Sequence, residues 1–336
     1  MNPNRLPERE KQSPSSDNIF RIFGEKTIAQ YGRDPNQISD YAHEEILTAF
    51  GPKFPFEDFQ NIHGTREIIR DAHYASKKLM EYGPEKYRAK NLENVTRFGV
   101  ENAGWLDTGG RTLVFPTYRY DDYAERADFG IAIIPPADSS EGRSEKLPFA
   151  VDVTYNASKI EEKLARSSND KNLEAPFHHT RLKYYNDGEE VGDKIVPRFV
   201  IAMDYFDDDK LTREKISSPG MLRVRFKVLS QLVPQAEEIA ARLSDSDPDE
   251  DLRETRDAND IYENLDSALR DSVDAILGSS DSSFRLLCED VSRAERNHKS
   301  RTGRPLPYSE KLKMVTDDIS RTDDVYAKML KKLEVL

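Results

Sequence analysis

The stretch "FAVDVTYNASKIEEKL" (residues 149–164) joins an apolar, β-branched run to a polar run with good helix formers. Its first seven residues favour a strand, and Asn156 or Ser158 can cap a helix that follows. Asp152 stands in the middle of the apolar run. Because a buried carboxylate is costly unless something pairs with it, we expect Asp152 to have a specific partner or role.

The segments around this stretch predict the rest of an α/β core. "RTLVFPTY" (111–118) and "ADFGIAIIP" (127–135) are typical of two earlier strands, and "RFVIAM" (198–203) of a later one. A helix after Pro84 should run to about Trp105. The order from residue 85 is therefore helix, three strands, helix, strand, which predicts a small mixed sheet with helices.

Helices are expected on both sides of this core. N-terminally, Ser39 can cap a helix through "DYAHEEILTAF", and a second helix should cover about Phe56 to Tyr82. C-terminally, apolar spacing predicts helices around residues 221–243 (with a kink at Pro234), 260–277, 284–299 and 309–333. The expected organisation is a disordered tail (1–18), a helical N-terminal extension (19–84), the core (85–205) and a helical C-terminal region (206–336).

Composition excludes several classes of protein. A single cysteine, Cys288, rules out an internal disulfide framework and fits a reducing cytoplasm, where we expect the protein to be. No apolar run approaches the ~18 residues that a membrane span needs, so no membrane partner is expected. The lack of a CxxC motif disfavours a structural zinc site, and no P-loop or GxGxxG motif indicates a nucleotide site.

The net charge of −12 is concentrated in one segment. Residues 237–281 hold 15 acidic and 4 basic residues, which gives −11, whereas residues 282–336 hold 12 basic and 9 acidic residues, which gives +3. The acidic segment should face away from any bound polyanion.

A second carboxylate is expected to lie beside Asp152. Side chains alternate along a strand, so Asp152 shares one face with Ala150 and Thr154. Asp128 stands at the start of the preceding strand, and an antiparallel hairpin would bring it to the end that carries Asp152. Two adjacent carboxylates repel unless a cation lies between them, and oxygen ligands without cysteine or histidine suit Mg²⁺ or Mn²⁺.

A structural role for Asp152 is the competing interpretation. An aspartate near a strand end often pairs with an arginine or caps the next helix. The two roles predict different energetics. Removing an aspartate that serves only a metal should cost little stability, whereas removing a paired one leaves its partner unsatisfied.

The segment "YRYDDYAERADFGIAI … FAVDVTYNASKIEEKL", in this order of elements, resembles a divergent member of the PD-(D/E)XK nuclease superfamily. The resemblance covers roughly residues 85–205 and implies a restriction-endonuclease-like core. It implies that Asp128 and Asp152 bind the metal, with the carbonyl of Val153 as a third ligand. It also implies a lysine near the second acid and a glutamate on the first helix.

Two positions depart from that pattern. Thr154 stands where the family has its lysine, so the lysine would come from the next helix, as Lys159 or Lys163. The glutamate is Glu93 or Glu101, and Glu93 is favoured because it lies further from the end of the predicted helix.

The resulting expectation is a metal-dependent nuclease that acts on nucleic acid, on DNA more than RNA. In "HHTRLKYY" (178–185), Arg181 and Lys183 among aromatic residues are the candidate contacts to the substrate, although a surface strand or loop with inward tyrosines is the favoured interpretation of the stretch. The alternative is an inactive nuclease-like scaffold that binds nucleic acid or protein, or self-associates through its C-terminal helices.

Overall fold

The computed structural model describes residues 46–47, 50, 54–81, 93, 96–101, 104–106, 111–124, 126–134, 146–169, 179–203, 219–245 and 252–334. The chain divides into two compact units, Met1–Ser76 and Lys77–Leu336. The expected disordered tail, residues 1–18, lies outside the described residues.

The first unit is helical and aromatic at its centre. Helix α3 (Phe56–His63) ends at Gly64, whose positive φ of 74° turns the chain into α4 (Thr65–Glu81). The single helix predicted over 56–82 is therefore wrong at this residue. Phe59 is fully buried, and its ring stacks on that of Phe54 with the centroids 5.3 Å apart.

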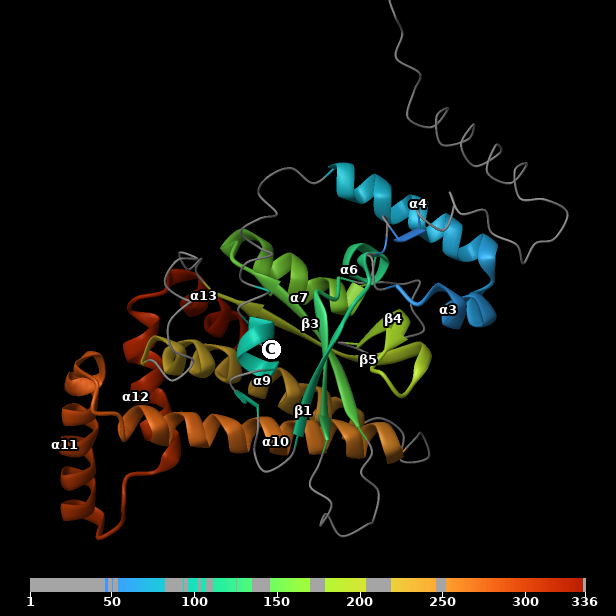
Figure 1. Cartoon of the computed structure of the whole chain (residues 1–336). Coiled ribbons are helices and arrows are strands. Elements are labelled where there is room, and N and C mark those ends of the chain that lie inside the picture. Colours follow the sequence, from blue (N-terminus) through green and yellow to red (C-terminus); the bar gives the residue numbers. More distant parts are fainter. Residues whose placement is uncertain are drawn as a thin grey trace, which may run out of the picture. The chain divides into compact units, whose positions relative to one another are not determined.

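A five-stranded mixed sheet forms the centre of the second unit (Figure 1). The strands are β1 (Arg111–Pro116), β2 (Phe129–Ile134), β3 (Leu147–Thr154), β4 (His179–Asn186) and β5 (Val191–Ala202), in the order β1-β2-β3-β5-β4. Among the strand pairs of the described residues, only β3–β5 is parallel. The α/β class and the strands expected near residues 111–118, 127–135 and 149–155 are confirmed.

The last part of the predicted order of elements was incomplete. Helix α7 (Ile160–Asn169), preceded by the short 3₁₀ helix η1 (Ala157–Lys159), is followed by the hairpin β4–β5 rather than by one strand. The expected strand "RFVIAM" is the second half of β5. The stretch "HHTRLKYY" forms most of β4, at the edge of the sheet.

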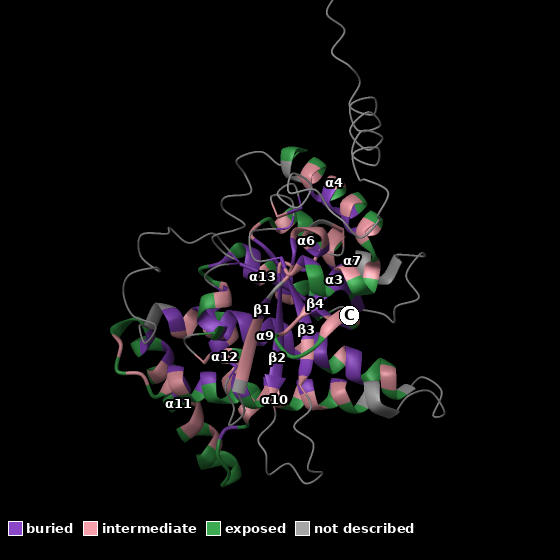
Figure 2. Cartoon of the chain, turned by 45° about the vertical axis from the view of Figure 1, so that its right-hand side comes forward, coloured by how far each residue is buried: buried purple, intermediate pink, exposed green. Residues whose placement is uncertain are grey.

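The two faces of the sheet pack against different helices. Phe149, Val151 and Phe199 belong to a large apolar cluster with α9 (Pro219–Asp245) and α10 (Leu252–Leu277). Val200 and Ala202, on the opposite face, pack with apolar residues of α7 and α13 (Asp324–Leu333). In Figure 2 the central strands β2 and β3 are coloured almost wholly as buried. The expected core (85–205) and the expected helical region (206–336) thus share one hydrophobic cluster.

Helix α9 also satisfies the backbone of β5. The Gln235 amide accepts from Val200 N (2.9 Å) and donates to Val200 O (2.8 Å), and Gln231 Oε1 accepts from Ala202 N (2.7 Å). The described pairing of β4 with β5 extends as far as Pro197. Beyond that residue, the two glutamines supply hydrogen bonds to β5 that a neighbouring strand would otherwise make. Helix α9 continues through Pro234, where the sequence predicted a kink.

Three more helices among the described residues are α6 (Arg119–Ala124), α11 (Arg285–Thr302), preceded by the 3₁₀ helix η2 (Ser282–Phe284), and α12 (Tyr308–Ser320). The single helix predicted over 309–333 is wrong, because α12 ends near Arg321 and α13 begins after Asp323. The Asp323 carboxylate accepts from Tyr326 N (2.8 Å) and so caps the new helix. Within the described residues, no helix is both long and apolar enough to span a membrane.

Candidate functional site

Asp128 and Asp152 lie opposite each other on one face of the sheet. In the antiparallel β2–β3 pair Phe129 is opposite Val151, so Asp128, one residue earlier, faces the position of Asp152. The backbone fixes this register, because Asp128 N donates to Val151 O (2.8 Å) and Val153 N donates to Asp128 Oδ2 (2.7 Å). Asp152 and Ala150 share the face of the sheet that α7 and α13 cover. The predicted convergence on one face is therefore present.

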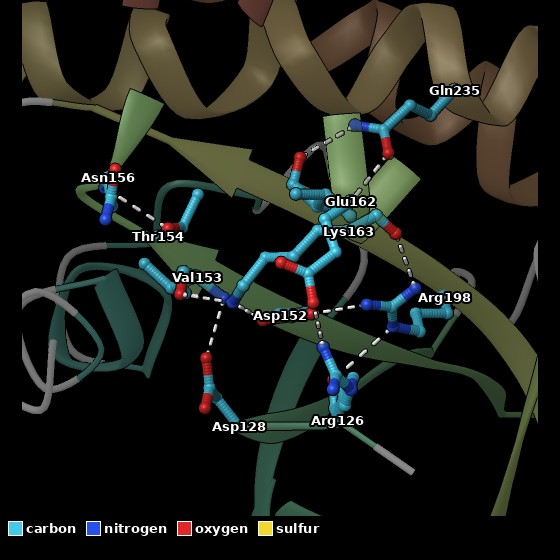
Figure 3. Close-up of polar contacts among 11 residues, drawn as sticks. Arg126, Asp128, Asp152, Val153, Thr154, Asn156, Glu162, Lys163, Arg198 and Gln235 are labelled. Atoms are coloured by element: carbon cyan, nitrogen blue, oxygen red, sulfur yellow. Dashed lines mark hydrogen bonds and ion pairs between the residues drawn. The ribbon is translucent and has the colours of Figure 1, made fainter. Parts of the chain in front are cut away.

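Asp152 is nearly fully buried, at 2% exposure, and is held by two cations (Figure 3). The Lys163 ammonium, from α7, donates to Oδ1, and the Arg198 guanidinium, from β5, donates to Oδ2. Lys163 Nζ also donates to the carbonyl of Val153 at 3.0 Å. The arginine partner that the structural interpretation required is present, together with a lysine beside the second acid.

Arg198 connects three segments of the site. Besides Asp152 on β3, its guanidinium donates to the carbonyl of Lys163 (3.2 Å) on α7 and to that of Arg126 (3.4 Å), which precedes Asp128 by two residues. Arg126 has a positive φ of 59°, which side chains rarely adopt. The buried guanidinium therefore stabilises both the strained turn before β2 and the start of α7.

The two carboxylates differ in their electrostatic environment. Burial raises the pKa of the Asp128 carboxyl well above its ordinary value, and the charges of Asp152, Asp122 and Glu93 raise it further, against the opposing effect of Lys163. Burial would also raise the pKa of Asp152, but Lys163 and Arg198 outweigh it and hold that pKa below its ordinary value. Asp152 is thus the firmly ionised member of the pair.

The structure separates the two candidate glutamates. Glu93 is buried, and its charge contributes to the raised pKa of Asp128, so it belongs to the same cluster. Glu101 is exposed and pairs with Arg97 at 3.8 Å. Glu93 is therefore the glutamate that the fold brings to the carboxylates.

The two candidate lysines are separated as well. Lys159 ends η1, is exposed, and pairs with Glu162 at 2.8 Å. Lys163 lies one helical turn later and reaches Asp152. Lys163 belongs to α7, which begins at Ile160, whereas Lys159 belongs to the preceding 3₁₀ turn.

The predicted substrate contacts on β4 do not join this cluster. Arg181 is exposed and forms a bidentate ion pair with Asp193 on β5. Lys183 is buried, and its ammonium lies 5.4 Å from the centre of the Tyr120 ring and 5.7 Å from that of Tyr184. The inward packing expected of the tyrosines is confirmed, since Tyr184 and Tyr185 are buried. Lys183 is buried as well, which disfavours contact with a polymer.

Sequence reasoning missed Arg198 and Asp122. Arg198 begins an otherwise apolar run, "RFVIAM". A single basic residue at the start of a buried strand was the signal that could have identified it as part of the site. Its partner could not be assigned, because the parallel β3–β5 register, which sets Ala150 opposite Arg198, depends on the tertiary fold.

Oxygen is the donor type at the site, which suits a hard divalent cation. Among the described residues, however, no group of three or more His, Cys, Asp or Glu side chains is arranged to hold a metal. The site therefore offers two facing carboxylates and the Val153 carbonyl, with Lys163 and Arg198 neutralising Asp152. A divalent cation would offset both the burial and the repulsion from Asp152 that raise the pKa of Asp128.

A separate cavity of about 680 Å³ lies at the junction of α10 and α11. Its lining includes Arg285, Arg293 and Arg296, but also Asp281 and Glu289, so its charge is nearly balanced. None of the clustered carboxylates lines it.

Comparison with known proteins adds no family: no protein-family model, curated protein or solved structure matches the chain.

Proposed function

We propose that this protein is a metal-dependent nuclease, with a restriction-endonuclease-like core, that hydrolyses phosphodiester bonds in DNA more than in RNA. The observation that carries the proposal is the pair of carboxylates, Asp128 and Asp152, opposite each other on one sheet face with a lysine ammonium beside them. These are the positions at which the resemblance to the PD-(D/E)XK superfamily implies metal ligands and a lysine.

Asp128, Asp152 and the Val153 carbonyl would hold Mg²⁺ or Mn²⁺, with Glu93 close enough to influence the charge of the site. Such a cation, when bound, lowers the pKa of a water ligand and stabilises charge that develops at the phosphoryl group. The chain's own contribution is positioning. Arg198 fixes Asp152, and Lys163 supplies a positive charge beside the ligands.

A second function is favoured by one observation. Both oxygens of Asp152 already accept from cations of the protein, an arrangement typical of a structural ion pair. An inactive nuclease-like domain that binds nucleic acid or protein would retain this pairing without needing a metal.

Cleavage assays on the full chain distinguish the two functions. Supercoiled and linear duplex DNA, single-stranded DNA and RNA are incubated with the protein and Mg²⁺ or Mn²⁺. We expect the wild-type chain to cleave DNA, and Asp128→Asn and Asp152→Asn to lose this activity. The controls Glu101→Gln and Lys159→Met, which change exposed charged residues outside the cluster, should keep it.

A folded wild-type chain that cleaves none of these substrates would exclude the nuclease and leave the binding scaffold. Cleavage that survives in folded Asp128→Asn and Asp152→Asn variants would show that the activity does not arise from this site.

A further inference from the structure

The Lys163 ammonium lies where the proposed metal ligands meet. It donates to Asp152 Oδ1 and, at 3.0 Å, to the carbonyl of Val153, which are two of the groups assigned to the cation. Its charge also opposes the rise in the pKa of Asp128, the third. A metal ion and this ammonium cannot occupy the same position, because both are cations that need the same oxygens.

The second cation on Asp152 is held differently. Arg198 has a side chain only 5% exposed, contacts Oδ2, and donates to two backbone carbonyls as well. The Lys163 side chain is 18% exposed and sits on a flexible four-carbon stem. Arg198 is therefore the fixed counter-charge of Asp152. The Lys163 ammonium can move away from Asp152 with a smaller loss of contacts.

We infer that Lys163 is an exchangeable cation: its ammonium holds Asp152 Oδ1 and the Val153 carbonyl while no metal is bound, and a divalent cation displaces it. The inference rests on the proposed metal site. The exchange keeps the buried Asp152 carboxylate compensated in both states, since Arg198 stays in place. Lysine and metal then compete, and the lysine lowers the affinity of the site for the metal.

Binding of Mn²⁺ to the chelator-treated full chain tests this competition by titration calorimetry. Removal of a competing charge in Lys163→Met or Lys163→Gln should tighten Mn²⁺ binding by about tenfold or more. Lys159→Met removes the same charge from an exposed lysine that pairs with Glu162. This variant should bind Mn²⁺ within about twofold of the wild-type affinity. Adding Asp128→Asn to Lys163→Met should abolish the tight site.

Unchanged or weaker Mn²⁺ binding in the folded Lys163 variants would overturn the inference and leave the nuclease proposal standing. Absence of Mn²⁺ binding in both the wild type and these variants would overturn the metal site itself, and the inference with it.

A second measurement uses only the wild-type chain and does not depend on the folding of a variant. Reductive methylation of lysines is followed by mass spectrometry with and without Mg²⁺. Displacement predicts that Mg²⁺ speeds the modification of Lys163 several-fold while that of Lys159 stays constant. An equal or slower rate at Lys163 with Mg²⁺ bound would contradict displacement.

Discussion

At the scale of single residues, Asp152 has one feature of each of the two roles that its sequence position left open. It faces Asp128, as a metal ligand would, and it pairs with Arg198, as a structural aspartate would. The expectation that Asp152 could be removed at little cost to stability is not compatible with these pairings. Its loss would leave a buried guanidinium and an ammonium without their shared carboxylate.

We therefore predict that Asp152→Ala lowers the free energy of unfolding by about 3–5 kcal/mol in the presence of a chelator. Urea denaturation followed by circular dichroism measures the change. The matched control is Asp193→Ala, which breaks the exposed pair with Arg181 and should cost less than about 1 kcal/mol. Equal costs for the two variants would show that the Asp152 ion pairs add nothing to stability.

Part of this site could be predicted from the sequence. Alternation along a strand and a hairpin between adjacent strands were enough to place Asp128 and Asp152 on one face. The choice between Lys159 and Lys163 was not accessible, since it depends on the tertiary contact between α7 and Asp152 on β3. Arg198 required the register of a parallel pair that only the complete fold defines.

At the scale of elements, β5 is the strand that connects the site to the rest of the unit. It carries Arg198, pairs with β3, and has the edge beyond Pro197 covered by glutamines of α9. Its partner β4 was left open as strand or loop, because a polar, basic stretch such as "HHTRLKYY" lacks the alternation that marks a strand. The structure buries six of the eight residues of β4, namely His179, Thr180 and residues 182–185, and leaves Arg181 exposed.

Gln235→Met should remove both hydrogen bonds to the backbone of Val200 while keeping the size of the side chain. Leaving a buried N–H and C=O without partners costs about 1–3 kcal/mol. We expect that loss in urea denaturation, together with faster hydrogen exchange at the Val200 amide. Glu238→Gln, on the same helix, serves as the control. A variant as stable as the wild type would show that other groups satisfy this edge.

The β4–β5 hairpin should be sensitive to acid. The carboxyl of Asp187 is partly buried, which raises its pKa, but hydrogen bonds from Glu190 N, Glu189 N, the Tyr185 hydroxyl and Lys146 outweigh this and lower the pKa to about 2. A carboxyl with a depressed folded-state pKa stabilises the fold above its unfolded pKa. This contribution is lost as the pH falls from about 4 toward 2.

We expect Asp187→Asn to lower the free energy of unfolding by about 2 kcal/mol at pH 7, and the gap to the wild type to narrow below pH 4. Urea denaturation at several pH values measures both chains, with the exposed Asp271→Asn as the control. A gap that stays constant from pH 7 to pH 3 would contradict the assigned ionisation.

At the scale of the whole chain, the acidic segment at residues 237–281 is part of the fold and not an appendage. It includes all of α10, whose Leu265, Leu269 and Val273 are buried in the main core. Deleting it would therefore disrupt the core, and its charge has to be tested by substitution. Its acidic residues Glu263, Asp271 and Asp274 are exposed.

The triple variant Glu263→Gln, Asp271→Asn, Asp274→Asn should bind duplex DNA as well as the wild type or more tightly, since an acidic surface repels a polyanion. Fluorescence anisotropy with a labelled duplex, in a chelator that prevents cleavage, measures the affinity at two salt concentrations. A clear loss of affinity in the folded variant would place this surface in the binding site.

The most direct test of the account is the position of a divalent cation. Crystals soaked in Mn²⁺ and measured at an X-ray wavelength where manganese scatters anomalously would show any bound ion. The account predicts an anomalous peak between Asp128 and Asp152, within about 2.0–2.6 Å of an oxygen from each, with Lys163 moved off Asp152 Oδ1. Absence of a peak between these carboxylates at saturating Mn²⁺, with Lys163 and Arg198 both still bound to Asp152, would contradict it.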